Sequence, residues 1–472
     1  MVFNSIDFLL FFPILYFLYC IVKKRSQNLL LLVGSYFFYG YWDYRYLSLL
    51  LLSTVIDYIA SLGIENNRDN AHTKKLYLAL SIFSNLTILG FFKYYNFFTL
   101  SAKVALQSIG LNTSPILLEF ALPLGISFYT FQTMSYTIDV YRGHLKPTRN
   151  ILDFALFVSY FPQLVAGPIE RATNLLPQIL NERVITYEDI EKGIFLILFG
   201  FFKKVYVADN ISIIIDPIFA DSGASGSMVL FACIAHTFQI YGDFAGYSDI
   251  ARGLSKLMGI ELMRNFNHPL LSRNLGEFWR RWHISFMSWL RDYVYFSLGD
   301  KTSSELRKNI NNLFVFFLSG LWHGANWTFV IWGSISGIVN LTYKYLNPYL
   351  PGISEDRNKV TNFIIHVSGI ILTFLAVTLP LIFFRSQSIE MSFTQINSLL
   401  TNFGSLEPKL ISKLFKIVAL LMVVEIYQYI KEDEFSIFQL PIYVRTGLYL
   451  SLFYSTIILG NFNQNAFIYF VF

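Results

Sequence analysis

Long apolar runs are the feature that most constrains the fold of this chain. A transmembrane helix needs ~20 mostly apolar residues, and about ten or eleven runs of suitable length recur along the sequence. Hydrophobic residues make up 54% of the chain and charged residues only 14%, as is typical of polytopic membrane proteins. We therefore expect an all-α, polytopic integral membrane protein. The candidate spans are residues 7–22, 28–42, 44–64, 76–99, 116–140, 190–207, 226–242, 310–340, 361–384, 410–430 and 442–460.

The loops between the first spans predict their orientation in the bilayer. Lys and Arg collect in the loops at 23–25, 68–75 and 142–149, whereas the loops between these carry little positive charge. By the positive-inside rule, the basic loops face the cytoplasm and the N-terminus lies outside it. The run at 7–22 has neither a basic start nor a small-residue cleavage site, so we predict a retained span rather than a signal peptide.

Two further apolar segments, residues 152–168 and 284–299, are short or interrupted, which is typical of re-entrant or interfacial segments. Between them, residues 252–281 contain six basic residues and two acidic ones, and Arg291 follows in the next apolar piece. We expect this basic segment to face the cytoplasm close to the bilayer surface.

Charge and cysteine content exclude other classes of function. The net charge of +5 is small for 472 residues, so we expect no binding to nucleic acid. Cys20 and Cys233 lie in apolar runs at no metal or redox spacing and are expected to be small buried hydrophobic residues. No folded soluble domain is apparent, so chemistry beyond the membrane would need a second protein.

One histidine lies in the middle of an apolar run. Residues 309–343 contain no Asp, Glu, Lys or Arg, so His323 is the only group there that titrates near neutral pH. A titratable side chain at membrane depth is a candidate functional group, and imidazole suits reversible proton transfer near neutrality. Small residues surround it, Trp322 and Trp327 add aromatic walls, and Asn326 can donate a hydrogen bond. A neutral imidazole that merely links two helices remains an alternative.

A second histidine, His283, follows Arg280 and Arg281, where cationic groups near a basic loop can meet a phosphate. The alternative is an interfacial histidine beside ordinary positive-inside arginines. Forty residues separate His283 from His323, so no local metal-ligand spacing links them, and we expect no metal site.

Three segments mix Gly or Pro with polar side chains in apolar surroundings, as expected where helices break around a cavity. They are Leu122–Gly143, Val165–Arg171 and Phe238–Gly253. In the third segment, Asp243 and Asp249 are expected to pair with basic residues.

These motifs together resemble the membrane-bound O-acyltransferase (MBOAT) family, in its alginate O-acetyltransferase-like branch. The resemblance covers roughly residues 1–345, and the C-terminal spans contribute only hydropathy to it. The motifs that carry it are VFNSIDFLLFFPI, LPLGISFYTFQTMSYTIDVYRG, VAGPIER, QIYGDFAGYSDIARG, NFNHPLLSRNLGEFWRRWHISFMSWLRDYVYFSLG and SGLWHGANWTFVIWG.

The resemblance implies the MBOAT fold: about 10–11 transmembrane helices and re-entrant segments around a central funnel or tunnel, in one membrane domain over residues 1–472. Within it we expect N-terminal spans at 1–115, a catalytic core at 116–345 with the basic cytoplasmic re-entrant segment at 252–299, and C-terminal spans at 346–472. The implied catalytic residues are His323 and His283. The implied supporting or substrate-binding residues are Asn326, Arg280, Arg281, Trp279, Trp322, Arg291 and Asp243.

The activity implied by the resemblance is O-acetylation of an extracytoplasmic polysaccharide, such as an alginate-like exopolysaccharide, cellulose or peptidoglycan. Acetyl-CoA, or an acyl carrier, would be the cytoplasmic donor, with no bound cofactor. A partner acetyltransferase of the SGNH type would complete the transfer outside a bacterial cytoplasmic (inner) membrane. The alternatives are D-alanyl transfer to teichoic acids, a secondary transporter or flippase with a His and Asp proton relay, and a non-catalytic scaffold for polysaccharide export.

Overall fold

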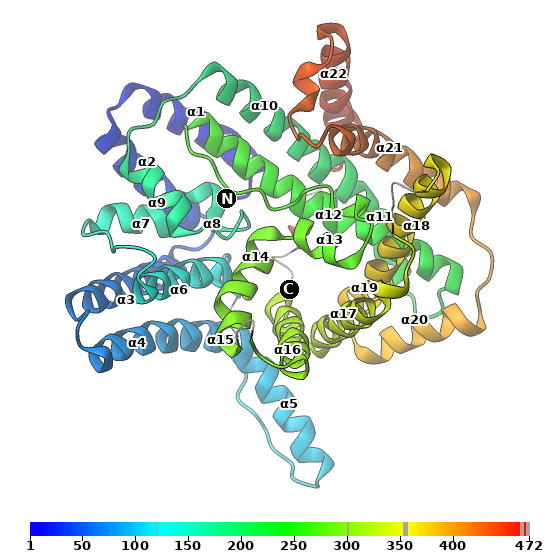
Figure 1. The fold of residues 1–472 in the computed structure, drawn as a ribbon, viewed down its shortest axis with the longest axis horizontal. Helices are drawn as coiled ribbons and strands as arrows, with labels where there is room; N and C mark the ends of the chain where they lie inside the picture. The colour runs from blue at the N-terminus through cyan, green and yellow to red at the C-terminus, as the bar shows by residue number, and fades with distance from the viewer. Residues whose placement is uncertain (120, 300–301, 353–356, 463–466, 469–472) are drawn as a thin grey trace. The chain divides into compact units, whose positions relative to one another are not determined.

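The computed structural model describes residues 1–119, 121–299, 302–352, 357–462, 467 and 468. Every regular element in these ranges is a helix (Figure 1), which confirms the all-α prediction. The chain forms two compact units. Unit 1 is Met1–Ile194 with Ala251–Met263, and unit 2 is Phe195–Ile250 with Arg264–Phe472. The predicted divisions at residues 115 and 345 are not tested by these units and stay predictions.

Unit 1 contains the N-terminal helices. Helices α3, α4 and α6 pack side by side, and α5 extends away from them at the bottom of Figure 1. The elements are α1 (Ile6–Ile21), α2 (Lys24–Gly40), η1 (Tyr44–Tyr46), α3 (Leu47–Asn66), α4 (Ala71–Leu89), η2 (Gly90–Tyr94), α5 (Tyr95–Ser108), α6 (Ile126–Arg142), α7 (Ile151–Ser159), α8 (Phe161–Leu164), α9 (Ala172–Leu180), the start of α10 (Tyr187–Phe201) and the end of α12 (Gly226–Leu257).

Unit 2 contains the two histidines singled out in the sequence. In it, α16 and α17 form a closely packed pair (Figure 1). Besides the remainder of α10 and α12, its elements are η3 (Phe202–Ala208), α11 (Asp209–Ala220), η4 (Pro269–Leu271), α13 (Leu275–Arg281), α14 (Ile284–Trp289), η5 (Leu290–Tyr295), α15 (Phe296–Leu298), α16 (Glu305–His323), α17 (Trp327–Leu346), η6 (Asn347–Tyr349), α18 (Lys359–Thr378), α19 (Leu381–Arg385), α20 (Ile389–Thr401), α21 (Pro408–Lys431), η7 (Ser436–Gln439) and α22 (Ile442–Leu459).

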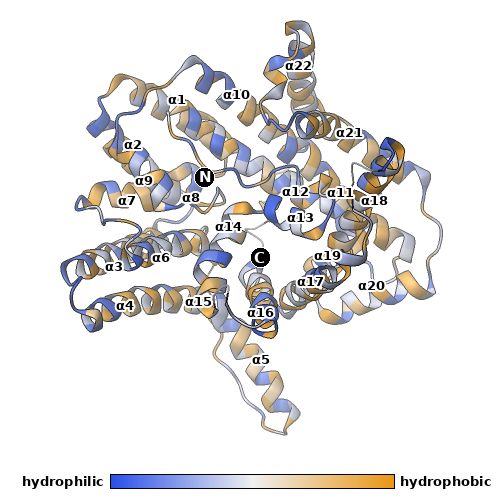
Figure 2. Ribbon diagram, viewed as in Figure 1, coloured by the Kyte–Doolittle hydropathy of each residue, from blue (hydrophilic) through white to orange (hydrophobic). Residues whose placement is uncertain are grey.

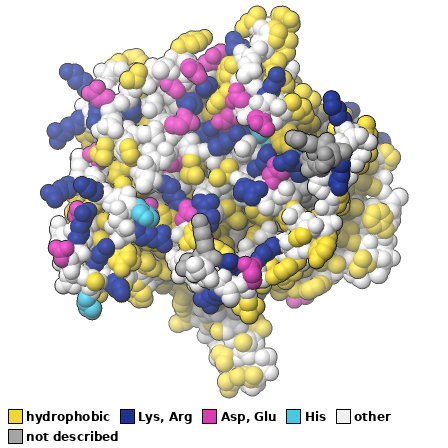
Figure 3. Space-filling view, viewed as in Figure 1, with side chains coloured by type: hydrophobic (Ala, Val, Ile, Leu, Met, Phe, Trp, Pro, Cys, Tyr) yellow, Lys and Arg dark blue, Asp and Glu magenta, His cyan; other side chains and the backbone are white. Residues whose placement is uncertain are grey.

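Several helices have the length and composition of membrane spans, so the protein is a multi-pass membrane protein. Within the described ranges, five helical stretches qualify, and α1 is a shorter apolar helix. Hydrophobic residues run along these helices (Figure 2), and yellow apolar side chains reach the surface between charged ones, most plainly on protruding α5 (Figure 3). The five stretches are Tyr44–Asn66, Ala71–Ser108, Gly226–Leu257, Lys359–Arg385 and Ile442–Leu459.

Several predicted spans differ from the helices observed, two of them by a break or a late start. The run 310–340 is not one span but two helices, because α16 ends at His323 and Asn326 caps the start of α17. The run 116–140 becomes helical only at Ile126, after Gly125 turns the chain with a positive φ of 72°. Residue 120 of that run lies outside the described residues, as do 353–356, 463–466 and 469–472 of the predicted C-terminal region.

A fully buried carboxylate ties three helices of unit 1 together. Asp57 of α3 is 0% exposed and accepts hydrogen bonds from Ser81 and Asn85 of α4 and from Thr137 of α6. The Asn85 and Thr137 bonds measure 2.7 and 2.9 Å. Ser53 extends the network by donating to Asn85 Oδ1 at 2.8 Å. Side-chain hydrogen bonds across membrane helices of this kind fix which faces meet.

Replacement of Asp57 by Ala should therefore destabilise unit 1, because it leaves buried donors without their acceptor at about 1–2 kcal/mol each. Asp57→Asn keeps one carbonyl acceptor and should lose less. Thermal unfolding in detergent measures both variants, with Asp69→Ala, an exposed position next to α3, as the control. Equal melting temperatures for Asp57→Ala and Asp69→Ala would contradict the role of this network.

Candidate active site

His323 is the last helical residue of α16, at a point where two helices are in backbone contact. A Cβ atom on Gly320 would lie 2.3 Å from the Phe329 carbonyl oxygen, and one on Gly333 would lie 2.4 Å from that of Phe316. Only glycine fits such a crossing, which is the close approach typical of small residues between membrane helices. The crossing holds the end of α16, and hence His323, against the first turns of α17.

Aromatic rings enclose the His323 side chain, which is only 4% exposed. Its ring meets Trp332 edge-on at a centroid distance of 5.1 Å, Phe384 at 5.5 Å and Trp322 at 5.0 Å. Edge-to-face contacts of this kind fix the plane of a ring. The imidazole is therefore held in one orientation in apolar surroundings.

His283 lies on a loop whose backbone conformation is unusual. Its φ of 44° and ψ of 53° are left-handed, a region that non-glycine residues adopt rarely and often at functional sites. Backbone hydrogen bonds flank it on both sides, from Asn267 N to Arg281 O and from Ile284 N to Asn265 O, each 2.9 Å long.

The fold brings the two histidines together. Their ring centroids are 6.5 Å apart although forty residues separate them in sequence. Phe286 contacts both rings, at 4.9 Å from His283 and 5.8 Å from His323, and stacks on Trp322 at 4.1 Å. The predicted aromatic wall at Trp322 is thus part of the packing between the two imidazoles.

His323 also lines a mainly apolar cavity of about 30 Å³, which is room for one or two water molecules. Trp279 and Trp332 line it as well, and the polar residues Thr237 and Ser336 complete the wall. The Trp279 Nε1 atom is buried, and none of the described residues accepts a hydrogen bond from it. His323 and Trp279 therefore line one small cavity.

The predicted basic segment consists largely of paired charges. Glu277 binds both Arg273 and Arg281, at 3.1 and 2.6 Å. Burial raises the pKa of Glu277, but hydrogen bonds from Arg273 and the charge of Arg281 more than offset this and hold it below its ordinary value. Arg291 pairs with its neighbour Asp292 at 2.8 Å.

The remaining basic residues of the segment are also paired or buried, with one exception. Lys256 pairs with Glu261, Arg264 with Glu434 at 3.2 Å, and Arg252 is buried. Arg280 differs, because it is exposed and none of the described carboxylates pairs with it.

Two predicted supporting residues have local structural partners. Asp243 pairs with Lys204 at 2.5 Å and accepts a 2.7 Å hydrogen bond from the backbone of Ile468. Asn326 caps α17 by accepting a hydrogen bond from Thr328 N at 3.0 Å. Their substrate-binding roles stay predictions, because these contacts neither require nor exclude them.

Sequence reasoning missed three residues near His283. His268 contacts Glu425, and Lys203 pairs with Glu425 at 3.0 Å and with Asp249 at 3.1 Å. A signal was present, since Glu425 and Lys203 interrupt apolar runs and an ionisable residue at membrane depth is a functional candidate. No cluster of three or more His, Cys, Asp or Glu in the described ranges is arranged to hold a metal.

Comparison with known proteins assigns this membrane helix bundle to a class. Residues 35–379 match the MBOAT, membrane-bound O-acyltransferase family. The chain is 43% identical over 338 residues to "Probable alginate O-acetylase AlgI" of Azotobacter vinelandii, covering 71% of this chain and 67% of the relative. It is 38% identical to the protein of the same name in Pseudomonas aeruginosa, covering 86% and 76%. It is 35% identical to "Peptidoglycan O-acetyltransferase" of Helicobacter pylori, covering 80% and 76%.

The protein belongs to the membrane-bound O-acyltransferase family. It is an O-acyltransferase, and an acyl donor is its cosubstrate. The paired histidines of unit 2 lie within the matched region.

Substitution of Gly320 by Ala should force α16 and α17 apart, because the added methyl group would overlap the Phe329 carbonyl oxygen at 2.3 Å. Overpacking of this kind costs about 1–3 kcal/mol, and it should also lower acyl transfer by moving His323. Thermal unfolding and acyl-transfer assays in detergent measure both effects. Gly447→Ala in α22, where a Cβ meets nothing within 4 Å, is the matched control. Unchanged stability and activity in Gly320→Ala would contradict the close crossing.

Proposed function

We propose that this protein transfers an acetyl group from cytoplasmic acetyl-CoA for the O-acetylation of an extracytoplasmic polysaccharide. The observation that carries the proposal is the placement of His323. Its imidazole lines a cavity, is buried among aromatic rings, and has its ring centroid 6.5 Å from that of His283. The names of relatives, alginate O-acetylase and peptidoglycan O-acetyltransferase, support acetyl as the group and a polysaccharide as the acceptor.

His323 acts as the general base of the transfer. It accepts the proton of the acceptor hydroxyl as the hydroxyl oxygen attacks the thioester carbonyl carbon. A C–O bond forms, the C–S bond breaks, and the proton passes to the departing CoA thiolate. We assign His283 to the same step as the second proton-handling group, since Phe286 packs against both rings. The nearly dry cavity favours transfer to the acceptor over hydrolysis by water.

Trp279 supports the negative charge that develops on the thioester oxygen. Trp279 lines the same cavity as His323, its indole N–H is buried, and no described residue accepts a hydrogen bond from it. A preorganised donor at such a place stabilises an oxyanion strongly, because little water competes for it. Asn326 caps α17 through its Oδ1 atom, which accepts from Thr328 N, so its Nδ2 group remains available as a second donor.

Arg280 is the basic residue that we assign to the phosphates of the donor. It is exposed and lies on α13, the same short helix that carries Trp279, whereas Arg281 is paired with Glu277. An arginine without a carboxylate partner binds phosphate without breaking an existing ion pair. The cavity of about 30 Å³ is much smaller than CoA, so only the acetyl end of the donor enters it.

The remaining steps fall to other molecules. We propose a bacterial cytoplasmic (inner) membrane as the location. An extracytoplasmic partner acetyltransferase of the SGNH type supplies the hydroxyl that receives the acetyl group and passes this group on to the polysaccharide. D-alanyl transfer from a carrier protein would use the same general base. The two functions are therefore distinguished by which acyl donor the protein accepts.

The first test is the release of CoA from radiolabelled acetyl-CoA by the purified protein in nanodiscs, with an extracytoplasmic extract as the source of partner and acceptor. His323→Ala should reduce release at least about 100-fold, because general-base catalysis supplies that much. The control is His72→Gln, at an exposed position near the start of α4.

Unchanged release by a folded His323→Ala protein would remove this residue from the catalytic role. Absence of release by the wild type, with carrier-bound D-alanine accepted instead, would establish the teichoic acid alternative. Solute flux in proteoliposomes without any acyl donor would favour a transporter.

Trp279→Phe tests the oxyanion donor, because it removes the indole N–H and keeps an aromatic ring. We expect kcat to fall about 100-fold, as for the loss of one oxyanion donor, while the KM for acetyl-CoA and the melting temperature change little. Trp42→Phe, at an exposed position after α2, is the control. A rise in KM with kcat unchanged would instead assign Trp279 to donor binding.

A further inference from the structure

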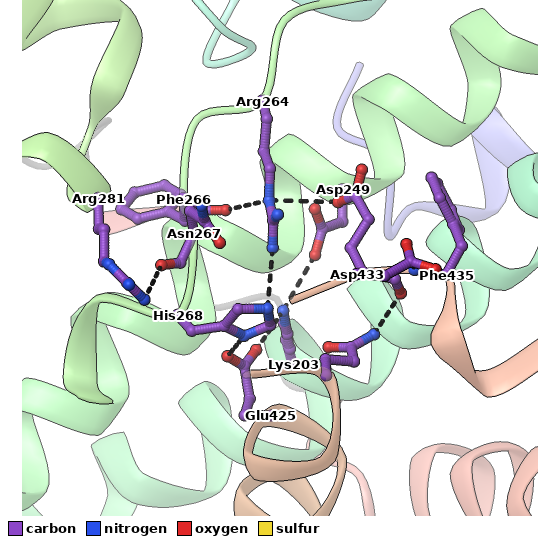
Figure 4. A network of polar contacts seen from close by, with 12 residues as sticks. Lys203, Asp249, Arg264, Phe266, Asn267, His268, Arg281, Glu425, Asp433 and Phe435 are labelled. Carbon is purple, nitrogen blue, oxygen red and sulfur yellow. Dashed lines mark hydrogen bonds and ion pairs between the residues drawn. The ribbon is translucent and has the colours of Figure 1, made fainter. Parts of the chain in front are cut away.

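A network of buried charges lies in unit 2 around His268 (Figure 4). Its centre is Glu425 of α21, only 4% exposed. One carboxylate oxygen accepts hydrogen bonds from Tyr241 at 2.6 Å and from Lys203 at 3.0 Å, and the other contacts His268 Nδ1 at 2.5 Å. Lys203 is also paired with Asp249 at 3.1 Å.

The neighbours of His268 define which tautomer its neutral ring adopts. Arg264 Nη2 lies 3.1 Å from His268 Nε2, and a guanidinium only donates, so Nε2 is the acceptor. The proton of a neutral imidazole is then on Nδ1, which donates to Glu425. Arg264 itself is held by Glu434 at 3.2 Å. Both ends of the segment 264–268 are therefore fixed by carboxylates of the C-terminal part of the chain.

The segment 264–268 in turn holds the backbone on both sides of His283. Asn267 N donates to Arg281 O and Asn265 O accepts from Ile284 N. Asn265 Oδ1 also accepts from the Ser285 hydroxyl at 2.9 Å. A displacement of 264–268 would therefore be transmitted to His283 through these hydrogen bonds.

The backbone of both histidines is strained. His268 has a φ of 47° and His283 a φ of 44°, and only Glu432 joins them as a non-glycine residue with positive φ in the described ranges. Such conformations cost about 1–3 kcal/mol each and persist only where surrounding contacts hold them. Glu425 supplies such a contact directly to His268.

We propose that Glu425 is a positioning residue for His283: through His268 and the segment 264–268, it fixes the loop that presents His283 to His323. The inference rests on the proposed function of His283 in acyl transfer. Glu425 and Glu434 both lie beyond residue 379, where the match to the family ends. The C-terminal helices would thus contribute to the reaction without contacting the reacting atoms.

The test compares Glu425→Gln with the wild type. The variant keeps the shape and one carbonyl acceptor, and Lys203 keeps Asp249 as its partner, so the protein should still fold. Removal of the charge weakens the bond to His268 and loosens the segment 264–268. Misplacement of a catalytic group by about 1 Å costs roughly 100-fold in rate, so we expect kcat to fall about 10- to 100-fold with the KM for acetyl-CoA within about twofold.

Hydrogen exchange provides a readout that is independent of activity. In Glu425→Gln, amides of peptides covering 264–285 should exchange faster, while the rest of unit 2 exchanges as in the wild type. The matched control is Glu407→Gln, at an exposed glutamate that precedes the first residue of the same helix α21. It should leave both exchange and kcat unchanged.

A double-mutant cycle then separates positioning from general destabilisation. If Glu425 acts through His283, Glu425→Gln should lower kcat little further in a His283→Gln background. Full additivity of the two effects would overturn the proposal, as would faster exchange throughout unit 2 or unchanged exchange over 264–285.

The proposed function fails by a different measurement. Wild-type activity of the single variant His283→Gln would remove His283 from the reaction, and with it the catalytic purpose that the proposal assigns to Glu425. The exchange experiment on Glu425→Gln alone decides whether Glu425 holds the loop.

Discussion

In the hydrocarbon core of a bilayer, polar groups must find their partners within the protein, and the organisation of unit 2 depends on this constraint. Lys203 and Lys204 are adjacent in the π-helical segment η3 and are both buried. Each is paired with two carboxylates, so the pairs tie η3 to the helices that supply them. The carboxylates are Asp249 and Glu425 for Lys203, and Asp209 and Asp243 for Lys204.

The same constraint shapes the surroundings of His323. The rings of Trp322, Trp332 and Phe384 meet the imidazole edge-on and hold it in one orientation. A histidine oriented by ring edges is placed for base catalysis before the substrate arrives. The backbone contact at Gly320 brings α17, and with it Trp332, against the end of α16.

The sequence predicted the all-α membrane fold and the candidate histidine because both signals are local. Apolar runs define helices, and His323 is conspicuous in a stretch without other charges. The break after His323 was missed, because the run 310–340 contains no charged residue and the turn depends on Gly324 and the capping residue Asn326. The pairing of Glu425 with His268 joins residues 157 positions apart and has no local signature.

The position of Glu425 also explains why a charged side chain, rather than an apolar one, holds His268 and the segment 264–268. Apolar packing is non-directional and would hold the segment 264–268 without fixing the rotation of His268. A buried carboxylate with a defined donor at each oxygen specifies both the distance and the direction of that contact, at the cost of desolvation that Lys203 offsets. Such a site adds little stability, but it selects one geometry, which is what a strained backbone at His283 requires.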